Sequence, residues 1–402
     1  MTDCTMFWNS AYYGGVFHAR ESTISAIGCA MTRNLAHRGG AAYATSDSTI
    51  STGRCTMSSN TASDRGGALY ASSGAAILLN DTTISSNTAD WGGAVYASEA
   101  FATTRNCDIR SNTANGGGAV YNIAATFITT DCTMTFNSAR WGATVDAHLD
   151  STAILTHCTM NSNSALFGAV VYLLGDSTYT ATGCTMTSNH AAWWGGAIYA
   201  YQTSVVTLTD CDITSNRARV GGGVLRISDD SSGIATGYTM TSKIATREGG
   251  VIDARGYSTI TATNCTMTAN SASLGGALRL GGGSTLTATE CTMSSNSAVS
   301  GGAVYTGEHK ACFNTSTCEQ TALLILTGCD LTLNHANEQV FQISIQSAHS
   351  CVIAGRPNSI RPNVTHNRCG RAAQCTSKVL WKRIHRVLRS SSVVGFWGTP
   401  LD

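Results

Sequence analysis

The sequence is poor in proline, in charge and in long apolar runs. It has only 3 prolines in 402 residues, none of them before residue 357, and charged residues make up 12%. A globular enzyme of this size normally carries about twice that charged fraction and many more prolines, so the composition points away from that class. No run of about 18 apolar residues occurs, which excludes an ordinary membrane-spanning helix.

The two ends of the chain differ in character. The first residues, Met1 to Cys4, have neither the basic nor the apolar segment of a secretory signal peptide, and they begin inside a repeat, so we expect a fragment of a longer chain. From Gln339 onward there are nine Lys or Arg and one acid, Asp402, whereas the first 338 residues have a net charge of −7. The sequence therefore predicts a repeat domain at 1–338 and a basic tail at 339–402.

The pattern Cys-Thr-Met-x-x-Asn-x-Ala recurs every 25 to 27 residues. Its Asn fails once, at Lys243, and its Ala never fails from Ala11 to Ala336. A Gly-Gly or Gly-Ala pair and a short apolar segment follow. The first position of the pattern is Cys4, Cys29, Cys55, Thr82, Cys107, Cys132, Cys158, Cys184, Cys211, Tyr238, Cys265, Cys291 and Cys329.

This period predicts an all-β, single-stranded parallel β-helix of about 13 coils, with three short strands in each coil. Apolar and Thr residues alternate with period two, as in Ser258 to Thr263, which is typical of strands. Leucine-rich repeats need several Leu in each turn, and these are missing. An insertion at about 307–321 lengthens one spacing to 38 residues. The tail is either a cap for the open end of the solenoid or partly disordered.

Stacking places equivalent residues over one another about 4.8 Å apart. The Cys, Met and Val/Ile/Leu columns should fill the interior, and the Asn column should bond from coil to coil as a ladder. Parallel Cβ vectors suit a disulfide poorly, so the eleven repeat cysteines are expected to be free core residues. Cys312 and Cys318, in an insertion, could pair in an oxidising compartment. The sequence does not determine the disulfide state of these two or of Cys351, Cys369 and Cys375. No ligand spacing predicts a metal site, and no cofactor motif is present.

The Asn-x-Ala segment followed by Gly-Gly-Ala-Val resembles the repeats of chlamydial polymorphic outer-membrane proteins. The match includes Gly-Gly-Ala-Ile at Gly195 to Ile198, Gly-Gly-Ala-Val at Gly92 and at Gly301, and Met-x-x-Asn at Met186 to Asn189. It covers roughly residues 1–336. The resemblance implies a right-handed, pectin-lyase-like β-helix that is displayed at a cell surface or outside the cell and acts in adhesion.

Alternation predicts an outward column in the strand after the glycine pair. Within it, Arg226, Asp253 and Arg279 would lie about 5 Å apart. They are the best enzyme candidates, for a polysaccharide lyase or hydrolase, with Asp229 and Asp230 as the only nearby acids; a solvated ladder of alternating charge is the plainer interpretation. The whole column is His18, Tyr43, Tyr70, Tyr96, Tyr121, Asp146, Tyr172, Tyr199, Arg226, Asp253, Arg279 and Tyr305.

Large aromatic residues occupy a turn just before the glycines. Exposed aromatics along a rod make a platform for sugar rings or for a partner protein, although they could equally pack on neighbouring turns. The ligand-binding candidates are therefore Trp91, Trp141, Phe167, Trp193, Trp194, Tyr172 and Tyr199.

Two further surfaces carry weaker signals. Thr-x-Thr rows, such as Thr133 with Thr135, resemble ice-binding faces; Thr is also a good strand residue, and Asp108, Arg110, Asn161, Asp212 and Asp330 interrupt the rows. Asp146, His148 and Asp150 form an acid–His–acid cluster without a nearby nucleophile, which a tolerated surface variation explains.

The sequence therefore predicts adhesion or binding without catalysis, with a glycan or a surface protein of a host or neighbouring cell as the partner. A β-helix polysaccharide lyase or hydrolase is the first alternative, and ice binding is the second. No nucleic acid is expected as a partner. Membrane attachment would need missing segments or the tail, where Ser377 to Ser390 could form a basic amphipathic helix.

Overall fold

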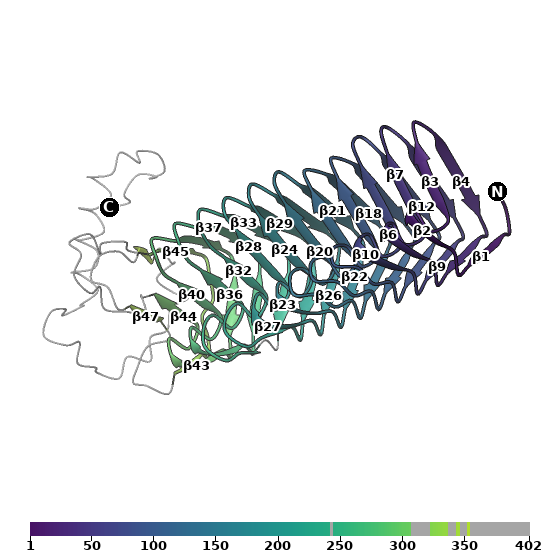
Figure 1. The fold of residues 1–402 in the computed structure, drawn as a ribbon. Helices are drawn as coiled ribbons and strands as arrows, with labels where there is room; N and C mark the ends of the chain where they lie inside the picture. The colour runs from purple at the N-terminus through teal and green to yellow at the C-terminus, as the bar shows by residue number, and fades with distance from the viewer. Residues whose placement is uncertain (242–243, 307–321, 337–342, 346–351, 354–402) are drawn as a thin grey trace, which may run out of the picture.

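The computed structural model describes residues 1–241, 244–306, 322–336, 343–345 and 352–353. These residues form an all-parallel β-solenoid whose coils stack side by side along one axis, with β1 and β4 at its N-terminal end (Figure 1). They contain no helix, and therefore none that could cross a membrane. The predicted fold class is confirmed.

Each coil runs through four sheets, which we call B, C, D and A in chain order. Sheet B carries the Thr-Met-Thr segment that follows each Cys. Its twelve strands are β1 (Thr5–Phe7), β5 (Ala30–Thr32), β9 (Thr56–Ser58), β13 (Thr83–Ser85), β16 (Asp108–Arg110), β19 (Thr133–Thr135), β22 (Thr159–Asn161), β26 (Thr185–Thr187), β30 (Asp212–Thr214), β34 (Thr239–Thr241), β38 (Thr266–Thr268) and β42 (Thr292–Ser294).

Sheet C contains the short segment between the Asn and the glycine pair. The sequence predicts three strands per coil and does not indicate this fourth one. It is short because the Asn turn and the glycine turn confine it to between two and five residues, and isolated bridges join its two parts. Its strands are β2 (Ser10–Tyr13), β6 (Leu35–Arg38), β10 (Thr61–Arg65), β23 (Ser164–Phe167), β27 (His190–Trp194), β31 (Arg217–Ala218), β35 (Ile244–Ala245), β39 (Ser271–Leu274), β43 (Ser297–Ser300) and β46 (His335–Ala336).

Sheet D follows the glycine pair. Its thirteen strands are β3 (Phe17–Arg20), β7 (Ala42–Thr45), β11 (Leu69–Ser72), β14 (Val95–Ser98), β17 (Val120–Ile123), β20 (Val145–His148), β24 (Val171–Leu174), β28 (Ile198–Tyr201), β32 (Leu225–Ile227), β36 (Ile252–Ala254), β40 (Leu278–Leu280), β44 (Val304–Thr306) and β47 (Ile343–Ile345).

Sheet A closes each coil. Its thirteen strands are β4 (Thr23–Ile27), β8 (Thr49–Gly53), β12 (Ala76–Asn80), β15 (Phe101–Arg105), β18 (Thr126–Thr130), β21 (Thr152–Thr156), β25 (Thr178–Thr182), β29 (Val205–Thr209), β33 (Ser232–Thr236), β37 (Thr259–Thr263), β41 (Thr285–Thr289), β45 (Leu323–Thr327) and β48 (Val352–Ile353).

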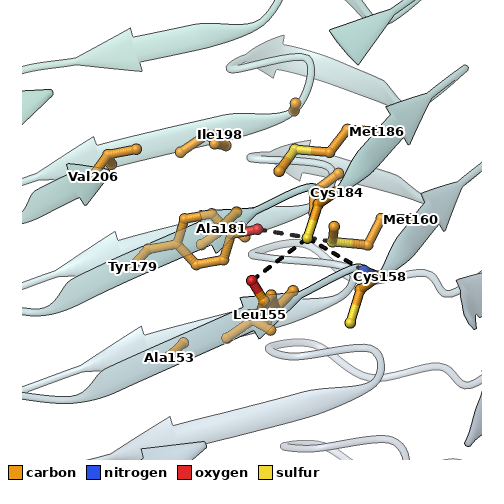
Figure 2. Close-up of a cluster of buried hydrophobic side chains, with 14 of the residues drawn as sticks. Ala153, Leu155, Cys158, Met160, Tyr179, Ala181, Cys184, Met186, Ile198 and Val206 are labelled. Carbon is orange, nitrogen blue, oxygen red and sulfur yellow. Dashed lines mark hydrogen bonds between the residues drawn. The ribbon is translucent and has the colours of Figure 1, made fainter. Parts of the chain in front are cut away.

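The interior contains the predicted columns. Figure 2 shows Cys158 and Cys184 stacked over one another, with Met160, Met186 and Tyr179 around them, and all five side chains are buried. The cysteines of the repeat are free thiols. Each thiol bonds instead to backbone, as the Cys184 thiol does to the Leu155 carbonyl at 3.6 Å, so these residues fill the core as expected.

The Asn ladder is also confirmed. The side-chain oxygen of Asn137 accepts the backbone N–H and the side-chain amide of Asn112, at 3.0 and 3.1 Å. The same contacts repeat from Asn9 to Asn216 and from Asn270 to Asn334. This ladder satisfies amide groups that the turn between sheets B and C would otherwise bury without partners.

The glycine pair makes the turn between sheets C and D. Gly92 has φ +68°, and a Cβ there would lie 2.3 Å from the Val95 carbonyl oxygen. A Cβ on Gly93 would lie 2.3 Å from the Gly118 carbonyl oxygen of the next coil. The first position needs a left-handed residue, which favours glycine; the second brings two backbones close together and is glycine or, at Ala143 and Ala169, alanine.

Strands β47 and β48 add one further strand each to sheets D and A beyond residue 338. The remainder of the predicted tail lies outside the described residues. The same holds for the expected insertion at 307–321, the expected amphipathic helix at 377–390, and Cys312, Cys318, Cys351, Cys369 and Cys375.

Candidate functional site

Two columns of side chains meet where sheet C turns into sheet D. The tyrosine column is the predicted outward column of sheet D, whose residues pair in register from coil to coil. The corner column holds the residue just before each glycine turn. It consists of Tyr13, Arg38, Arg65, Trp91, Gly116, Trp141, Phe167, Trp194, Gly221, Glu248, Leu274 and Ser300.

The tyrosine column is largely buried, so the prediction that it is exposed was wrong. Alternation does turn it away from the main core, but an aromatic or arginine corner residue covers the tyrosine-column residue of the next coil. The Arg65 guanidinium lies 5.1 Å from the Tyr96 ring, and the Trp91 and Tyr121 rings are 5.1 Å apart. Beneath this cover, the rings of Tyr43, Tyr70, Tyr96 and Tyr121 form a buried stack.

Glycine replaces the covering side chain in front of both buried aspartates of this column. Gly116 precedes Asp146 by one coil, and a Cβ on Gly116 would lie 2.4 Å from the Asp146 carboxylate. Gly221 precedes Asp253 in the same way, with a corresponding distance of 2.7 Å. Both carboxylates are fully buried. Each fits only because the glycine of the preceding coil has no side chain in that space.

Arg226, Asp253 and Arg279 lie next to one another in register, as expected. They are not the exposed ladder that was predicted: all three are buried. Asp253 bonds to Arg226 through one carboxylate oxygen and to Arg279, at 3.1 Å, through the other. Since Arg and Asp alternate along the column, each charge finds its partner in the neighbouring coil.

Two residues that the sequence analysis missed complete this group. Arg255 pairs with Glu248, and its Nε lies 3.4 Å from Asp253. Glu248 belongs to the corner column and lies 3.9 Å from Arg226. Their positions gave a signal: Arg255 is two residues after Asp253, and Glu248 directly precedes a glycine pair. We call Arg226, Glu248, Asp253, Arg255 and Arg279 the ion cluster.

The two acids considered as helpers of Asp253 lie elsewhere. Asp229 and Asp230 are exposed in a left-handed turn after β32, with φ of 54° and 59°. Asp229 bonds to Tyr201 and, with its negative charge, raises the pKa of that phenol. Within the described residues, neither acid forms a hydrogen bond or an ion pair with Asp253.

Asp146 and His148 form a pair, but Asp150 does not join them. His148 Nε2 lies 2.7 Å from one carboxylate oxygen of Asp146, and the other oxygen has no hydrogen-bond partner among the described residues. Burial raises the pKa of Asp146 to about 6, an effect that the bond to His148 partly opposes. Asp150 is exposed in the following turn, where its φ is 59°.

Five of the seven predicted ligand-binding aromatics come together on two neighbouring coils. Trp194 contacts Phe167 at 5.5 Å, Tyr199 at 6.0 Å and Trp193 at 6.4 Å between ring centroids. Tyr172 lies 5.4 Å from Tyr199. We call Phe167, Tyr172, Trp193, Trp194 and Tyr199 the aromatic cluster.

Exposure separates the members of the aromatic cluster. Trp193 has 50% of its surface exposed, whereas Tyr199 is buried and the other three are half-buried. The register shifts by one residue between β23 and β27, because β27 has one residue more before the glycine turn. Trp193 lies in this bulge, and bulges commonly redirect a side chain.

Trp91 and Trp141 form a separate pair. Their rings are 6.2 Å apart and nearly parallel, at 9°, above Gly116, which has no side chain to keep them apart. Both are half-buried, so the predicted exposed turn column is exposed only at Trp193. This pair covers the Asp146 region rather than presenting a flat surface to a ligand.

The predicted Thr-x-Thr rows lie on the outer face of sheet B, where the expected Asp, Arg and Asn residues interrupt them. Sheet A has a more regular feature, which the sequence analysis missed. The last residue of eight successive strands is threonine, partly or fully exposed. These residues are Thr130, Thr156, Thr182, Thr209, Thr236, Thr263, Thr289 and Thr327.

The described residues contain no group of three or more His, Cys, Asp or Glu placed to hold a metal ion. The geometry therefore offers an aromatic surface, a buried ion cluster beside it and a threonine column. The Arg226 guanidinium, 5.2 Å from the Trp194 ring, joins the first two.

Comparison with known proteins identifies one family. The family model described as a right-handed beta helix region matches residues 14–194 and 169–377, which together cover most of the chain. No curated protein and no solved structure matches the sequence.

Proposed function

The chain belongs to the right-handed β-helix family, and from this premise we propose that it is a non-catalytic binding protein that recognises a glycan through its aromatic cluster. We also propose that it is displayed at a cell surface or outside the cell, like the polymorphic outer-membrane proteins that its repeats resemble. Labelling of intact source cells with an antibody to the solenoid tests this placement, and labelling only after lysis would contradict it.

The exposed indole of Trp193 is the observation that carries the proposal. A tryptophan with half of its surface in water forgoes the hydrophobic free energy that burial of its indole would provide. Such exposure suggests that a ligand covers the ring when bound. The Trp193 ring contacts Trp194, and Trp194 in turn contacts Phe167, so two further rings support the exposed indole. Flat, amphipathic rings of this kind suit the apolar face of a sugar.

The acid groups support binding rather than cleavage. A glycoside hydrolase generally needs two carboxylates that flank the scissile bond. Asp253 is fully buried and both of its oxygens are engaged by guanidiniums, while Asp146 is buried beneath the Trp91–Trp141 pair. Neither carboxylate is open to a polymer in this arrangement, which favours a binding role over the lyase or hydrolase alternative.

A glycan array tests the proposal. Trp193→Ala should weaken binding about tenfold, because one stacked ring contributes about 1 to 1.5 kcal/mol. Phe101→Ala is the matched control, since Phe101 is 59% exposed but lies on sheet A, away from the aromatic cluster. Equal binding by wild type and Trp193→Ala, or no binding to any glycan, would contradict the proposal.

Ice binding is a second candidate, because of the unbroken threonine column on sheet A. Parallel strands place its eight hydroxyl groups about 4.8 Å apart in a straight row, a regularity that strand propensity alone does not require. Thr236→Lys with Thr263→Lys should abolish thermal hysteresis if this face binds ice, whereas Thr103→Lys, outside the column, should not. A wild-type protein without thermal hysteresis would eliminate this candidate.

A further inference from the structure

The ion cluster holds more positive than negative charge. Its three guanidiniums face two carboxylates, which leaves one positive charge in excess at neutral pH. Arg226, Asp253 and Arg279 are buried, and Glu248 is only 12% exposed. A buried excess charge is costly unless a counter-charge accompanies it.

Three buried donors in and beside this cluster have no acceptor among the described residues. They are Nε of Arg226, Nε of Arg279 and the indole N–H of Trp194. Each unsatisfied buried donor destabilises the fold, and an anionic oxygen is the strongest acceptor for a guanidinium. The unpaired donors and the excess positive charge therefore both favour an anionic ligand at this cluster.

The ion cluster is only partly shielded from solvent. Arg255 is its most exposed member, at 31%, and Glu248 lies beside it. Burial, followed by the positive charges of Arg226 and Arg279, lowers the pKa of Arg255, so an added negative charge would stabilise this guanidinium. Arg226 packs on the ring of Trp194, which belongs to the aromatic cluster.

We propose that the ion cluster binds the oxyanion of an acidic sugar whose ring lies on the neighbouring aromatic cluster. The group is a carboxylate or a sulfate, and it enters beside Arg255. This inference rests on the proposed glycan-binding function and narrows it to one chemical class. It also assigns a role to Glu248. This carboxylate pairs with Arg255 and limits the net charge of the cluster without ligand to one positive charge.

Two substitutions of opposite sign test the charge requirement. Arg255→Gln removes the excess charge and should weaken binding of a glucuronate-rich and of a sulfated oligosaccharide about tenfold. Glu248→Gln doubles the excess charge and should strengthen it about threefold. Arg247→Gln is the control, because Arg247 is exposed next to Glu248 and is not a member of the ion cluster. Circular dichroism and unfolding curves of each variant establish that it is folded.

The two acidic oligosaccharides distinguish the source of the oxyanion, and a neutral glucose oligosaccharide separates this proposal from the previous one. Binding of the neutral and acidic ligands with equal affinity, both sensitive to Trp193→Ala, would overturn the oxyanion site and leave glycan binding intact. Equal effects of Arg255→Gln and Arg247→Gln would overturn it as well. A preference for acidic ligands that Arg255→Gln abolishes supports it.

A readout without glycans makes the anion site testable by itself. Millimolar glucuronate and sulfate should raise the melting temperature of the wild type above its value in chloride at equal ionic strength. Arg255→Gln should lose this difference, while Trp193→Ala should keep it. An identical shift in wild type and Arg255→Gln would mean that the anions act generally on the protein surface, and would overturn the proposal.

Discussion

Asn137 lies in the middle of the asparagine ladder, and its replacement by Ala should destabilise the solenoid more than most single substitutions. Its side chain makes four hydrogen bonds. The side-chain amide donates to the Ile109 carbonyl at 2.9 Å and to Asn163 Oδ1 at 3.3 Å. The side-chain oxygen accepts the backbone N–H and the side-chain amide of Asn112. The three asparagines lie in the buried turn between sheets B and C, and the Ile109 carbonyl lies in strand β16 of sheet B.

The expected cost follows from which groups lose their partners. Asn112 Nδ2 keeps the Ile84 carbonyl, and Asn163 Oδ1 keeps the Asn137 backbone N–H. The Asn112 backbone N–H loses its acceptor, and the Ile109 carbonyl loses this donor. A buried unsatisfied group costs about 1 to 3 kcal/mol, so we expect a loss of about 3 to 5 kcal/mol in the free energy of unfolding.

Hydrogen exchange is the appropriate assay, because solenoid coils contact mainly their neighbours and can open locally. Peptides that cover residues 105–140 should exchange about a hundredfold faster or more, while those from the ends of the rod should change little. Asn115→Ala is the control, since Asn115 is exposed and donates only to Asp90, at 3.3 Å. If Asn137→Ala and Asn115→Ala differed by less than about 0.5 kcal/mol, the reasoning would be refuted.

Two further substitutions test the corner between sheets C and D. Burial raises the pKa of Asp146 to about 6, so the folded chain holds this proton more tightly than the unfolded chain, and stability from this group is greatest below about pH 4 and lost as the pH rises through 6. The difference in unfolding free energy between wild type and Asp146→Asn should therefore change by up to about 3 kcal/mol between pH 4 and 7. Asp150→Asn, at an exposed position, is the control and should not show this change. Equal pH profiles for the two variants would contradict the burial argument. Gly92→Ala should lower the free energy of unfolding in urea by about 2 kcal/mol or more, because Gly92 has a left-handed φ and the added carbon would clash with the Val95 carbonyl oxygen. Gly53→Ala is the control and should change it little, because no atom lies within 4 Å of the added carbon. Similar losses in the two variants would contradict the steric argument.

The repeat predicts the inside of the solenoid well, because a fixed period and strict alternation decide which side chains face inward. Cys132 and Met134 lie where the period puts them, and Asn137 bonds as a ladder requires. The same logic fails outside the core. Alternation places Tyr121 on the outer face of sheet D, but it cannot tell that Trp91 of the preceding coil covers it.

The candidate site was predicted only in part for the same reason. Arg226 and Asp253 were correctly placed in adjacent coils, yet their burial depends on how sharply the chain bends at Gly222 and Gly249, which no local pattern expresses. Trp193 was grouped with the other aromatics by its position in the turn before the glycines, whereas its exposure results from a one-residue bulge. The ligand and the cellular location remain predictions.

Because the corner column and the tyrosine column are offset, the space for each buried aspartate is formed by two consecutive coils. The aspartate at 146 is accommodated by a glycine thirty positions earlier, at 116, and the one at 253 by the glycine at 221. A duplication or deletion of a single coil would therefore separate a carboxylate from the space it needs, even though the period was kept. Transplanting the Asp146 pocket into another solenoid accordingly requires a cassette of two coils, and the Asp253 pocket, which includes Arg279, requires three, each cut inside sheet A rather than at the glycine turn.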